Sequence, residues 1–211
     1  MYYRNSDVRL EEMPRPQIGS GEMLVRVIAS GICGSDVLEW YRIHKAPLVL
    51  GHEVAGTVAE TGPGVSKYKV GDRIAASHHV PCFTCHYCMS GHETVCDTLR
   101  STNFYPGGFA EYVRLPAINV DRGVYPLPEG VDFEEGSFAE PLACVINGQE
   151  LSGVKLGEVV VVIGYGPIGS FQLELARSKG ASKTILAEVA QERLDAAKAL
   201  GTADVYVNPA S

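Results

Sequence analysis

Four cysteines lie close together in the sequence with the spacing of a metal site. Residues 81–106 are rich in Cys, His and Gly, and they contain the pattern C-x2-C-x2-C-x7-C. Such spacing lets one loop aim several thiolates at one point, and four thiolates with no open position describe a structural zinc site. We therefore predict a structural zinc ion in residues 81–106, the cysteine lobe. A single-iron site of the same geometry, two disulfides and free thiols are alternatives. The predicted ligands are Cys82, Cys85, Cys88 and Cys96.

A second set of possible metal ligands is spread over separate segments. Cys33 lies in Gly-Ile-Cys-Gly-Ser-Asp, and Glu140 lies in Ala-Glu-Pro-Leu. His52 and Glu53 lie in Gly-His-Glu-x-x-Gly. One thiol, one imidazole and carboxylates suit an open zinc site, in which three protein ligands leave a position for water or substrate. Each residue alone is a weak signal, because a single cysteine is usually a small buried apolar residue.

A glycine-rich motif has the context of a dinucleotide-binding turn. Residues 164–169 read G-x-G-x-x-G, follow an apolar run and open a predicted helix. The N-terminus of that helix offers unpaired N–H groups and a positive dipole to phosphates, and proline is tolerated in a first helical turn. We therefore predict that this turn binds the cofactor pyrophosphate. The predicted cofactor-binding residues are Gly164, Gly166, Pro167, Ile168 and Gly169.

An acidic residue follows this motif at the distance typical of dinucleotide-binding domains. Glu188 ends the next predicted strand, 19 residues beyond Gly169. A carboxylate there accepts hydrogen bonds from both ribose hydroxyls and repels a 2′-phosphate, which favours NAD over NADP. Arg193 is a candidate to cover the adenine or to attract a 2′-phosphate; the alternative is a solvated arginine on a helix.

The elements that must position these residues divide into two parts. Up to residue 132 the chain shows short β segments with Gly and Pro turns, which predicts an irregular antiparallel β-barrel. From Phe133 the pattern becomes a helix over Phe133–Leu151 and then strand, helix, strand, helix, strand. We expect a domain over residues 1–148 and a partial Rossmann α/β domain over residues 149–211. The predicted barrel strands include Met23–Ile28, Val54–Ala59, Arg73–Ala76 and Ala110–Leu115.

The α/β part begins with a wholly apolar strand, Val159–Ile163, as expected for a strand that is buried on both faces. The sequence supplies only one of the two βαβαβ halves of a doubly wound domain. We therefore expect a fragment of a longer enzyme, or a partner that supplies the rest, and no activity from the 211-residue chain alone. The other predicted elements are Ile168–Lys179, Thr184–Ala187, Gln191–Leu200 and Val205–Val207.

Composition excludes several functional classes. The 211 residues carry a net charge of −7 without a Lys/Arg run, which argues against a nucleic-acid binder. The absence of an apolar stretch of about 18 residues argues against a membrane span. A secretory signal is also lacking, so we expect a cytoplasmic protein, in which clustered cysteines favour metal binding over disulfides.

Taken together, the motifs resemble the medium-chain zinc-dependent alcohol dehydrogenase family. Residues 51–56 look like the zinc signature of that family, and the cysteine lobe, residues 108–112 and the dinucleotide motif follow in the order the family uses. Cys-Gly-Ser-Asp with Glu-Pro-Leu looks most like the sorbitol (polyol) and threonine dehydrogenase branches. The resemblance implies a GroES-like β-barrel catalytic domain followed by the partial Rossmann domain.

The resemblance also implies roles for the residues of the second set. Cys33 and His52 would bind catalytic zinc, with Glu53 and Glu140 as variable ligands, direct or through water. Ser35 would contact the substrate hydroxyl and start a proton relay. Polyol dehydrogenases of this type commonly carry His at the position of Leu38, so water, a ribose hydroxyl or His44 would have to continue the relay.

The expected activity is hydride transfer between a secondary alcohol or polyol and NAD, with one catalytic and one structural zinc. The expected partners are the small-molecule substrate and further copies of the chain, in a homo-dimer or tetramer. The alternatives are an amino-alcohol dehydrogenase of the threonine type and a non-catalytic zinc-binding protein of the same fold.

Overall fold

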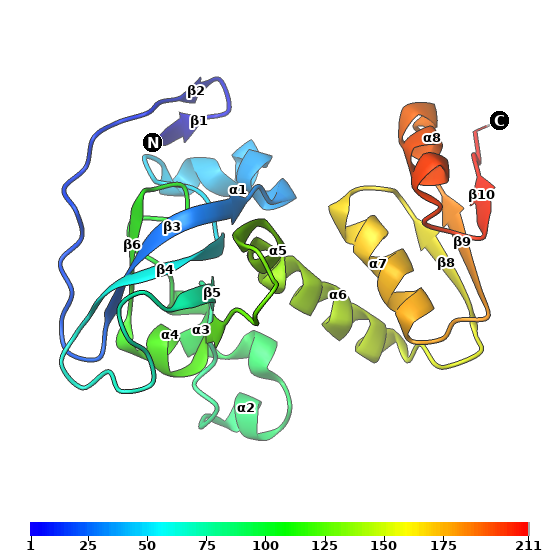
Figure 1. Ribbon diagram of the computed structural model, residues 1–211. Coiled ribbons are helices and arrows are strands. Elements are labelled where there is room, and N and C mark those ends of the chain that lie inside the picture. The colour runs from blue at the N-terminus through cyan, green and yellow to red at the C-terminus, as the bar shows by residue number, and fades with distance from the viewer. Residues whose placement is uncertain (211) are drawn as a thin grey trace. The chain divides into compact units, whose positions relative to one another are not determined.

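The computed structural model describes residues 1–210, which form two compact units, Met1–Glu140 and Pro141–Ser211 (Figure 1). We call them the first and the second unit and describe each by itself. Helix α6 (Ala139–Ser152) contains both the junction between the units and the domain boundary predicted after residue 148. The fold class is the predicted one, a GroES-like part followed by part of a Rossmann domain.

An antiparallel sheet organises the first unit. In the described residues its strand order is β6-β3-β4-β5-β7. The register pairs Gly31 of β3 with Glu53 of β4, and Glu53 with Ser77 of β5. The end of β3 therefore lies beside the start of β4, which brings Cys33 and His52 to the same edge of the sheet. The strands are β3 (Met23–Gly31), β4 (Glu53–Thr61), β5 (Arg73–Ser77), β6 (Tyr112–Leu115) and β7 (Val124–Pro126).

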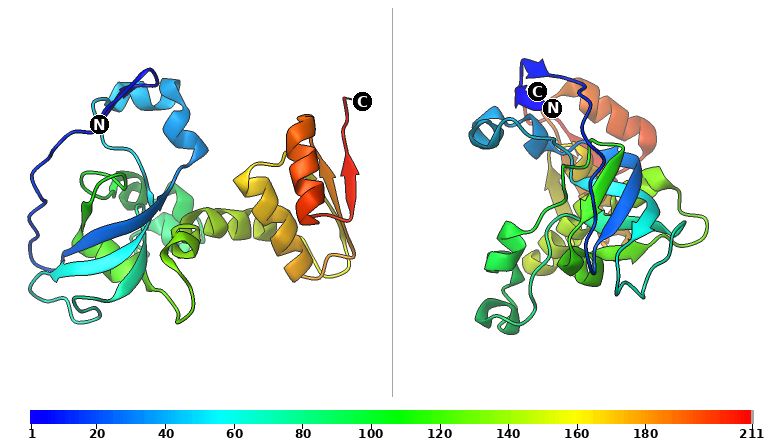
Figure 2. Two further views of the ribbon diagram at one scale, coloured as in Figure 1. Left: turned by 45° about the horizontal axis from the view of Figure 1, so that its top comes forward. Right: turned by 90° about the vertical axis from the view of Figure 1, so that its left-hand side faces the viewer.

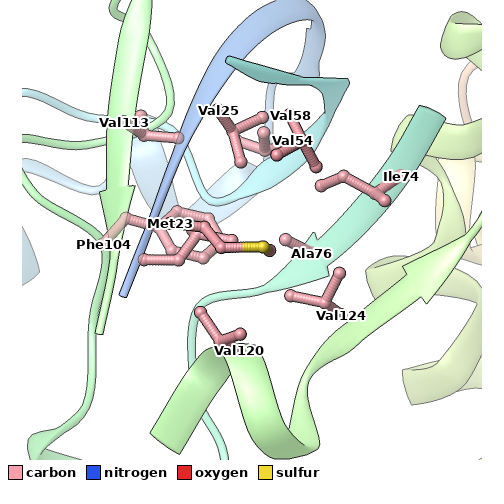
Figure 3. Packing of buried hydrophobic residues seen from close by; sticks show 11 residues of the cluster. Met23, Val25, Val54, Val58, Ile74, Ala76, Phe104, Val113, Val120 and Val124 are labelled. Carbon is pink, nitrogen blue, oxygen red and sulfur yellow. The ribbon is translucent and has the colours of Figure 1, made fainter. Parts of the chain in front are cut away.

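The core of the first unit lies on one side of this sheet (Figure 3). Met23, Val25 and Ile74 are completely buried there, and Val120 of α4 (Ala117–Arg122) packs against them. Alternate residues of each strand form this buried face, and Leu24, Ala55 and Ala75 are buried on the opposite face. Burial of these side chains fixes the sheet register, and the register fixes the position of the residues at its edge.

Short helices and a hairpin complete the first unit. The cysteine lobe, which contains α2, projects from the sheet in Figures 1 and 2. The segment after β3 folds into three consecutive turns, η1 (Gly34–Val37), α1 (Glu39–Arg42) and η2 (Ile43–Lys45). The remaining elements are β1 (Tyr2–Arg4), β2 (Asp7–Val8), α2 (His86–Met89), η3 (Glu93–Val95), α3 (Asp97–Ser101) and α5 (Phe133–Ser137).

The expected helix over Phe133–Leu151 is two helices, α5 and α6, which meet at Phe138. Asp132 and Glu135 form a capping box that starts α5. Pro141 lies in the first turn of α6, where its missing N–H is tolerated. In one continuous helix the proline ring would clash with the carbonyl of Ser137, which explains the break.

The second unit is a parallel sheet that is covered by helices on one face. Parallel strands in the order β10-β9-β8 carry α7 and α8 against one side, where Leu173, Leu186 and Leu194 are buried (Figure 2). The predicted strand–helix pattern is confirmed. The elements are β8 (Val159–Ile163), α7 (Pro167–Ser178), β9 (Lys183–Ala187), α8 (Gln191–Leu200) and β10 (Val205–Val207).

The expectation that β8 is buried on both faces is wrong for this structure. Val159, Val161 and Ile163 are 57%, 57% and 86% exposed, whereas Val162 packs into the core beneath α7. Side chains of a strand alternate between its faces, and α7 and α8 cover only one of them. No helix within residues 1–210 is both long and apolar enough to cross a membrane.

Candidate active site

Cys33, His52 and Glu53 converge at the edge of the sheet in the first unit. Their ligand atoms all lie within 4.8 Å of one another. His52 and Glu53 are buried, at 9% and 5% exposure. A Cβ atom on Gly31 would lie 2.0 Å from Oε2 of Glu53, so the glycine leaves the space that this carboxylate occupies. The sequence therefore brings a thiol, an imidazole and a carboxylate to one point.

Asp36 orients the imidazole of this cluster. Its Oδ1 lies 3.5 Å from Nδ1 of His52, which leaves Nε2 for another partner. Burial lowers the pKa of His52, but the hydrogen bond and charge of Asp36, with those of Cys33, outweigh burial and raise the pKa to about 9. A carboxylate on the second ring nitrogen is the usual companion of a metal-binding histidine.

Asp36 is itself fixed by two further donors. The backbone N–H of Cys33 donates to Oδ2 at 3.2 Å, and Nη2 of Arg42 donates to Oδ1 at 3.2 Å. Burial raises the pKa of Asp36, but the hydrogen bond and charge of His52, the Cys33 N–H and Arg42 lower it more, so the net direction is downward. Asp36 is therefore a buried carboxylate with its ionised form stabilised, at 3% exposure.

Glu140 acts on Glu53 through its charge. It lies in the first turn of α6 and is outside the cluster of three converging ligand atoms. The pKa of Glu53 is raised, first by burial and then by the negative charges of Glu140 and Asp36, against the lowering effect of His52. The exchange of Glu53 and Glu140 at one metal stays a prediction.

Ser35 is held by Arg42. Nη2 of Arg42 donates to Oγ of Ser35 at 2.9 Å, and Nε donates to the Ser35 carbonyl oxygen at 2.9 Å. Leu38 and His44 are exposed. The partnership with Arg42 has no signal in the sequence, because it depends on how residues 34–45 fold into consecutive turns.

Two further histidines lie behind His52. The rings of His52 and His78 are 4.7 Å apart, and those of His78 and His79 are 3.8 Å apart, centre to centre. Nδ1 of His79 lies 2.6 Å from the Thr102 carbonyl oxygen, and in the described residues Nδ1 of His78 has no hydrogen-bond partner. Burial lowers the pKa of His78 to about 2, which keeps this ring neutral. Sequence reasoning missed both residues.

The cysteine lobe brings its four sulfurs together. Separations are 3.9 Å for Cys82–Cys88, 3.5 Å for Cys85–Cys88 and 3.7 Å for Cys82–Cys96. A tetrahedron with metal–sulfur bonds of about 2.3 Å has edges of about 3.8 Å, whereas a disulfide requires about 2.05 Å. These distances fit four thiolates around one ion and do not fit the disulfide alternative.

The glycine-rich turn of the second unit joins β8 to α7. Gly164 has φ of +96°, a conformation that glycine adopts without strain. A Cβ on Gly169 would lie 2.1 Å from the Gly164 carbonyl oxygen, whereas a Cβ on Gly166 would meet no protein atom within 4 Å. The first and third glycines therefore serve the turn itself. The second leaves open space beside the start of α7, where Pro167 is the first helical residue and Ile168 is 47% exposed.

Glu188 is bound to the glycine-rich turn. Its Oε2 accepts from the N–H of Tyr165 at 2.7 Å, and its Oε1 accepts from the N–H of Ala190 at 2.8 Å. The N–H groups of Ala190 and Tyr165 are the main causes that lower the pKa of Glu188. Both carboxylate oxygens therefore have backbone partners, and Glu188 is buried, at 5% exposure. Arg193 is exposed on α8, and its charge also lowers the Glu188 pKa.

Comparison with known proteins adds to this geometry. The family of the alcohol dehydrogenase GroES-like domain matches residues 19–129. The chain is 38% identical over 210 residues to sorbitol dehydrogenase of Bombyx mori, covering 96% of this chain and 59% of that protein. It is 38% identical over 200 residues to D-xylulose reductase A of Aspergillus niger, covering 90% and 55%.

A solved structure of similar fold is a zinc-binding dehydrogenase from Sinorhizobium meliloti 1021 bound to NADP. It superimposes with a TM-score of 0.85 at 34% identity, covering 99% of this chain and 60% of that chain. The chain thus spans somewhat more than half the length of the relatives that it matches.

Proposed function

The chain belongs to the medium-chain zinc-dependent alcohol dehydrogenase family, and from this premise we propose that the protein transfers hydride between a secondary alcohol or polyol and NAD. The observation that carries the proposal is the convergence of Cys33, His52 and Glu53 on one point. In the reaction the alcohol loses a hydride to NAD⁺ and a proton to the protein or solvent. The products are the ketone, NADH and a proton.

The donor set fits a catalytic zinc. Cys33 and His52 would hold the ion, with Glu53 or Glu140 as the third ligand, and Asp36 would fix the ring of His52. Zinc, when bound, supplies a Lewis acid that lowers the pKa of the substrate hydroxyl. Ser35 would accept the hydroxyl proton and pass it to solvent.

The other predicted binding residues have separate roles in the proposal. The cysteine lobe would hold a structural zinc, because four thiolates leave no position for substrate. Gly164, Gly166 and Gly169, with the start of α7, would hold the pyrophosphate of NAD, which accepts the hydride when bound. Glu188 would bind the ribose hydroxyls, and Arg193 would lie beside the adenine.

Polyols are the favoured substrate class. Sorbitol dehydrogenase and D-xylulose reductase are among the similar proteins, which supports the polyol reading over the amino-alcohol one. The complete set of polar residues at the sheet edge also argues against a non-catalytic protein of the same fold. Assembly into a dimer or tetramer and a cytoplasmic location stay predictions.

The test is a substrate panel on the full-length protein loaded with zinc. We expect NADH formation with secondary alcohols and polyols, a much lower rate with L-threonine, and no turnover by Cys33→Ser under the same conditions. Turnover of L-threonine alone would move the assignment to amino alcohols. A zinc-loaded wild type that oxidises none of these substrates would overturn the proposed function.

A further inference from the structure

Arg42 makes three hydrogen bonds to the two residues that follow the Cys33–Gly34 pair. Its Nε and Nη2 atoms reach the carbonyl oxygen and Oγ of Ser35, each at 2.9 Å, and Nη2 also reaches Oδ1 of Asp36 at 3.2 Å. The Arg42 side chain is only 13% exposed. Its guanidinium also lies over the ring of Tyr41, 4.9 Å from the ring centre. The side chain is therefore held on several sides.

We propose that Arg42 is a positioning residue that holds Oγ of Ser35 through one lone pair, which leaves the second lone pair to accept the substrate proton and the Oγ hydrogen to be passed on. The inference rests on the proposed dehydrogenase function, because that function gives the Ser35 hydroxyl its task. It adds a residue that neither the sequence motifs nor the proposed ligand set contains.

The direction of the hydroxyl follows from the inventory of donors and acceptors. A serine hydroxyl has one hydrogen to donate and two lone pairs, and a guanidinium only donates. Arg42 therefore occupies a lone pair of Oγ and cannot receive the Ser35 hydrogen. The second lone pair stays available to accept the substrate proton, and the hydrogen stays available for the next acceptor in the relay. Since arginine keeps its charge in proteins, Arg42 orients the hydroxyl and does not itself carry a proton.

The planar fork of the guanidinium explains why arginine suits this position. Nε and Nη2 of Arg42 donate hydrogen bonds to the carbonyl oxygen and to Oγ of the same residue, Ser35. This fixes both the loop and the rotation of the hydroxyl. A lysine offers a single ammonium on a flexible stem and cannot hold both atoms in that geometry. The apolar side chain of Leu38 offers the hydroxyl no hydrogen bond.

Lys45 provides a matched control. It carries the same charge in the same run of turns, and its Nζ lies 5.3 Å from the centre of the same Tyr41 ring. None of the described hydrogen bonds joins it to Ser35 or Asp36. Lys45→Ala therefore removes a neighbouring cation and leaves the hydrogen bond from Arg42 to the Ser35 hydroxyl in place.

The test is a double-mutant cycle in the full-length, zinc-loaded protein. We expect Arg42→Ala and Ser35→Ala each to lower kcat about 10- to 100-fold, the scale of misplacing a reacting group. KM should change about threefold or less, and the double variant should be no slower than the slower single variant. Arg42→Lys should recover part of the lost kcat, and Lys45→Ala should keep the wild-type rate.

A readout without turnover uses cobalt in place of zinc. The visible absorption of Co²⁺ reports the binding of trifluoroethanol in the presence of NAD. We expect equal cobalt content in all variants, and about tenfold weaker trifluoroethanol binding in Arg42→Ala, in Ser35→Ala and in the double variant. An equal loss in all three is the signature of one shared role.

The two proposals fail differently. An active wild type in which the losses from Arg42→Ala and Ser35→Ala multiply would overturn the role of Arg42 and leave the dehydrogenase assignment intact. Loss of cobalt from Arg42→Ala would likewise show a structural role only. A wild type that neither oxidises alcohols nor binds trifluoroethanol would overturn the proposed function and the role of Arg42 together.

Discussion

Asp36 joins three parts of the candidate zinc site, although its carboxylate is not a proposed ligand. It accepts from the Cys33 N–H and from Arg42, and it faces Nδ1 of His52. The Cys-Gly-Ser-Asp motif contains this residue, but spacing alone does not show which group a buried carboxylate will meet. Its role follows from the register of β3 and β4, which places His52 opposite the turn after Cys33.

Asp36→Asn should weaken zinc binding at this site about 10- to 100-fold, the usual effect of losing the carboxylate behind a metal-binding histidine. The cysteine lobe should keep its zinc. Competition with a chromophoric chelator measures both sites, and Asp195→Asn on the exposed face of α8 is the control. An unchanged affinity of the Cys33–His52–Glu53 site would show that Asp36 does not orient the ligand.

Glu188 should determine the cofactor preference. Glu188→Ser removes the charge that repels a 2′-phosphate and the acceptor for the ribose hydroxyls, so NAD should bind more weakly and NADP more tightly. The ratio of kcat/KM for the two cofactors measures the change, and Glu192→Ser on α8 is the matched control. If the ratio is unaltered by Glu188→Ser, another residue such as Arg193 sets the preference.

At the scale of elements, the sequence predicted the glycine-rich turn but not the break between α5 and α6. The G-x-G-x-x-G turn lies between a strand and a helix as expected, because glycine suits the positive φ of Gly164 and the close contact of Gly169 with the Gly164 carbonyl oxygen. The break between α5 and α6 was missed although Pro141 signals it. The exposed face of β8 has no signal in its own sequence, because Val and Ile occupy both faces alike.

Alanine at Gly169 should mainly lower stability, whereas alanine at Gly166 should mainly weaken NAD binding. Gly169→Ala places a Cβ 2.1 Å from the Gly164 carbonyl oxygen and should cost roughly 1–3 kcal/mol of unfolding free energy, as overpacking does. Gly166→Ala has open space and should cost less than about 1 kcal/mol, yet it should weaken NAD binding. Denaturant unfolding and NAD titration separate the effects. Full NAD affinity in Gly166→Ala would contradict pyrophosphate binding at this turn.

The cysteine lobe should depend on its metal. Cys85→Ser removes one of four thiolates, so the lobe should lose its zinc and the protein about 3 kcal/mol or more of stability. Thermal unfolding, zinc content and proteolysis within residues 81–106 measure this, with Ser90→Ala as the control in the same lobe. Undiminished thermal stability together with unchanged zinc content would contradict a structural zinc site.

At the scale of the whole molecule, the proposed chemistry is divided between the two units. Both candidate metal sites lie in Met1–Glu140, and the glycine-rich turn lies in Pro141–Ser211. The change from short β segments to a strand–helix pattern indicates two parts in the sequence, whereas the units of the structure meet within α6, at residues 140 and 141, and not after residue 148. Hydrogen bonds between neighbouring turns, such as those of Arg42 to Ser35 and Asp36, could not be predicted, since they depend on how residues 34–45 fold into consecutive turns.

The zinc content of the purified full-length protein tests the central claim most directly. Two independent ligand sets, one thiolate-only and one mixed, predict two zinc ions per chain, and His52→Ala should retain one, in the cysteine lobe. Metal analysis that finds two equivalents in the wild type and one in His52→Ala is the result expected from a catalytic and a structural site. A wild type with a single zinc, unchanged by His52→Ala, would contradict a metal at Cys33, His52 and Glu53.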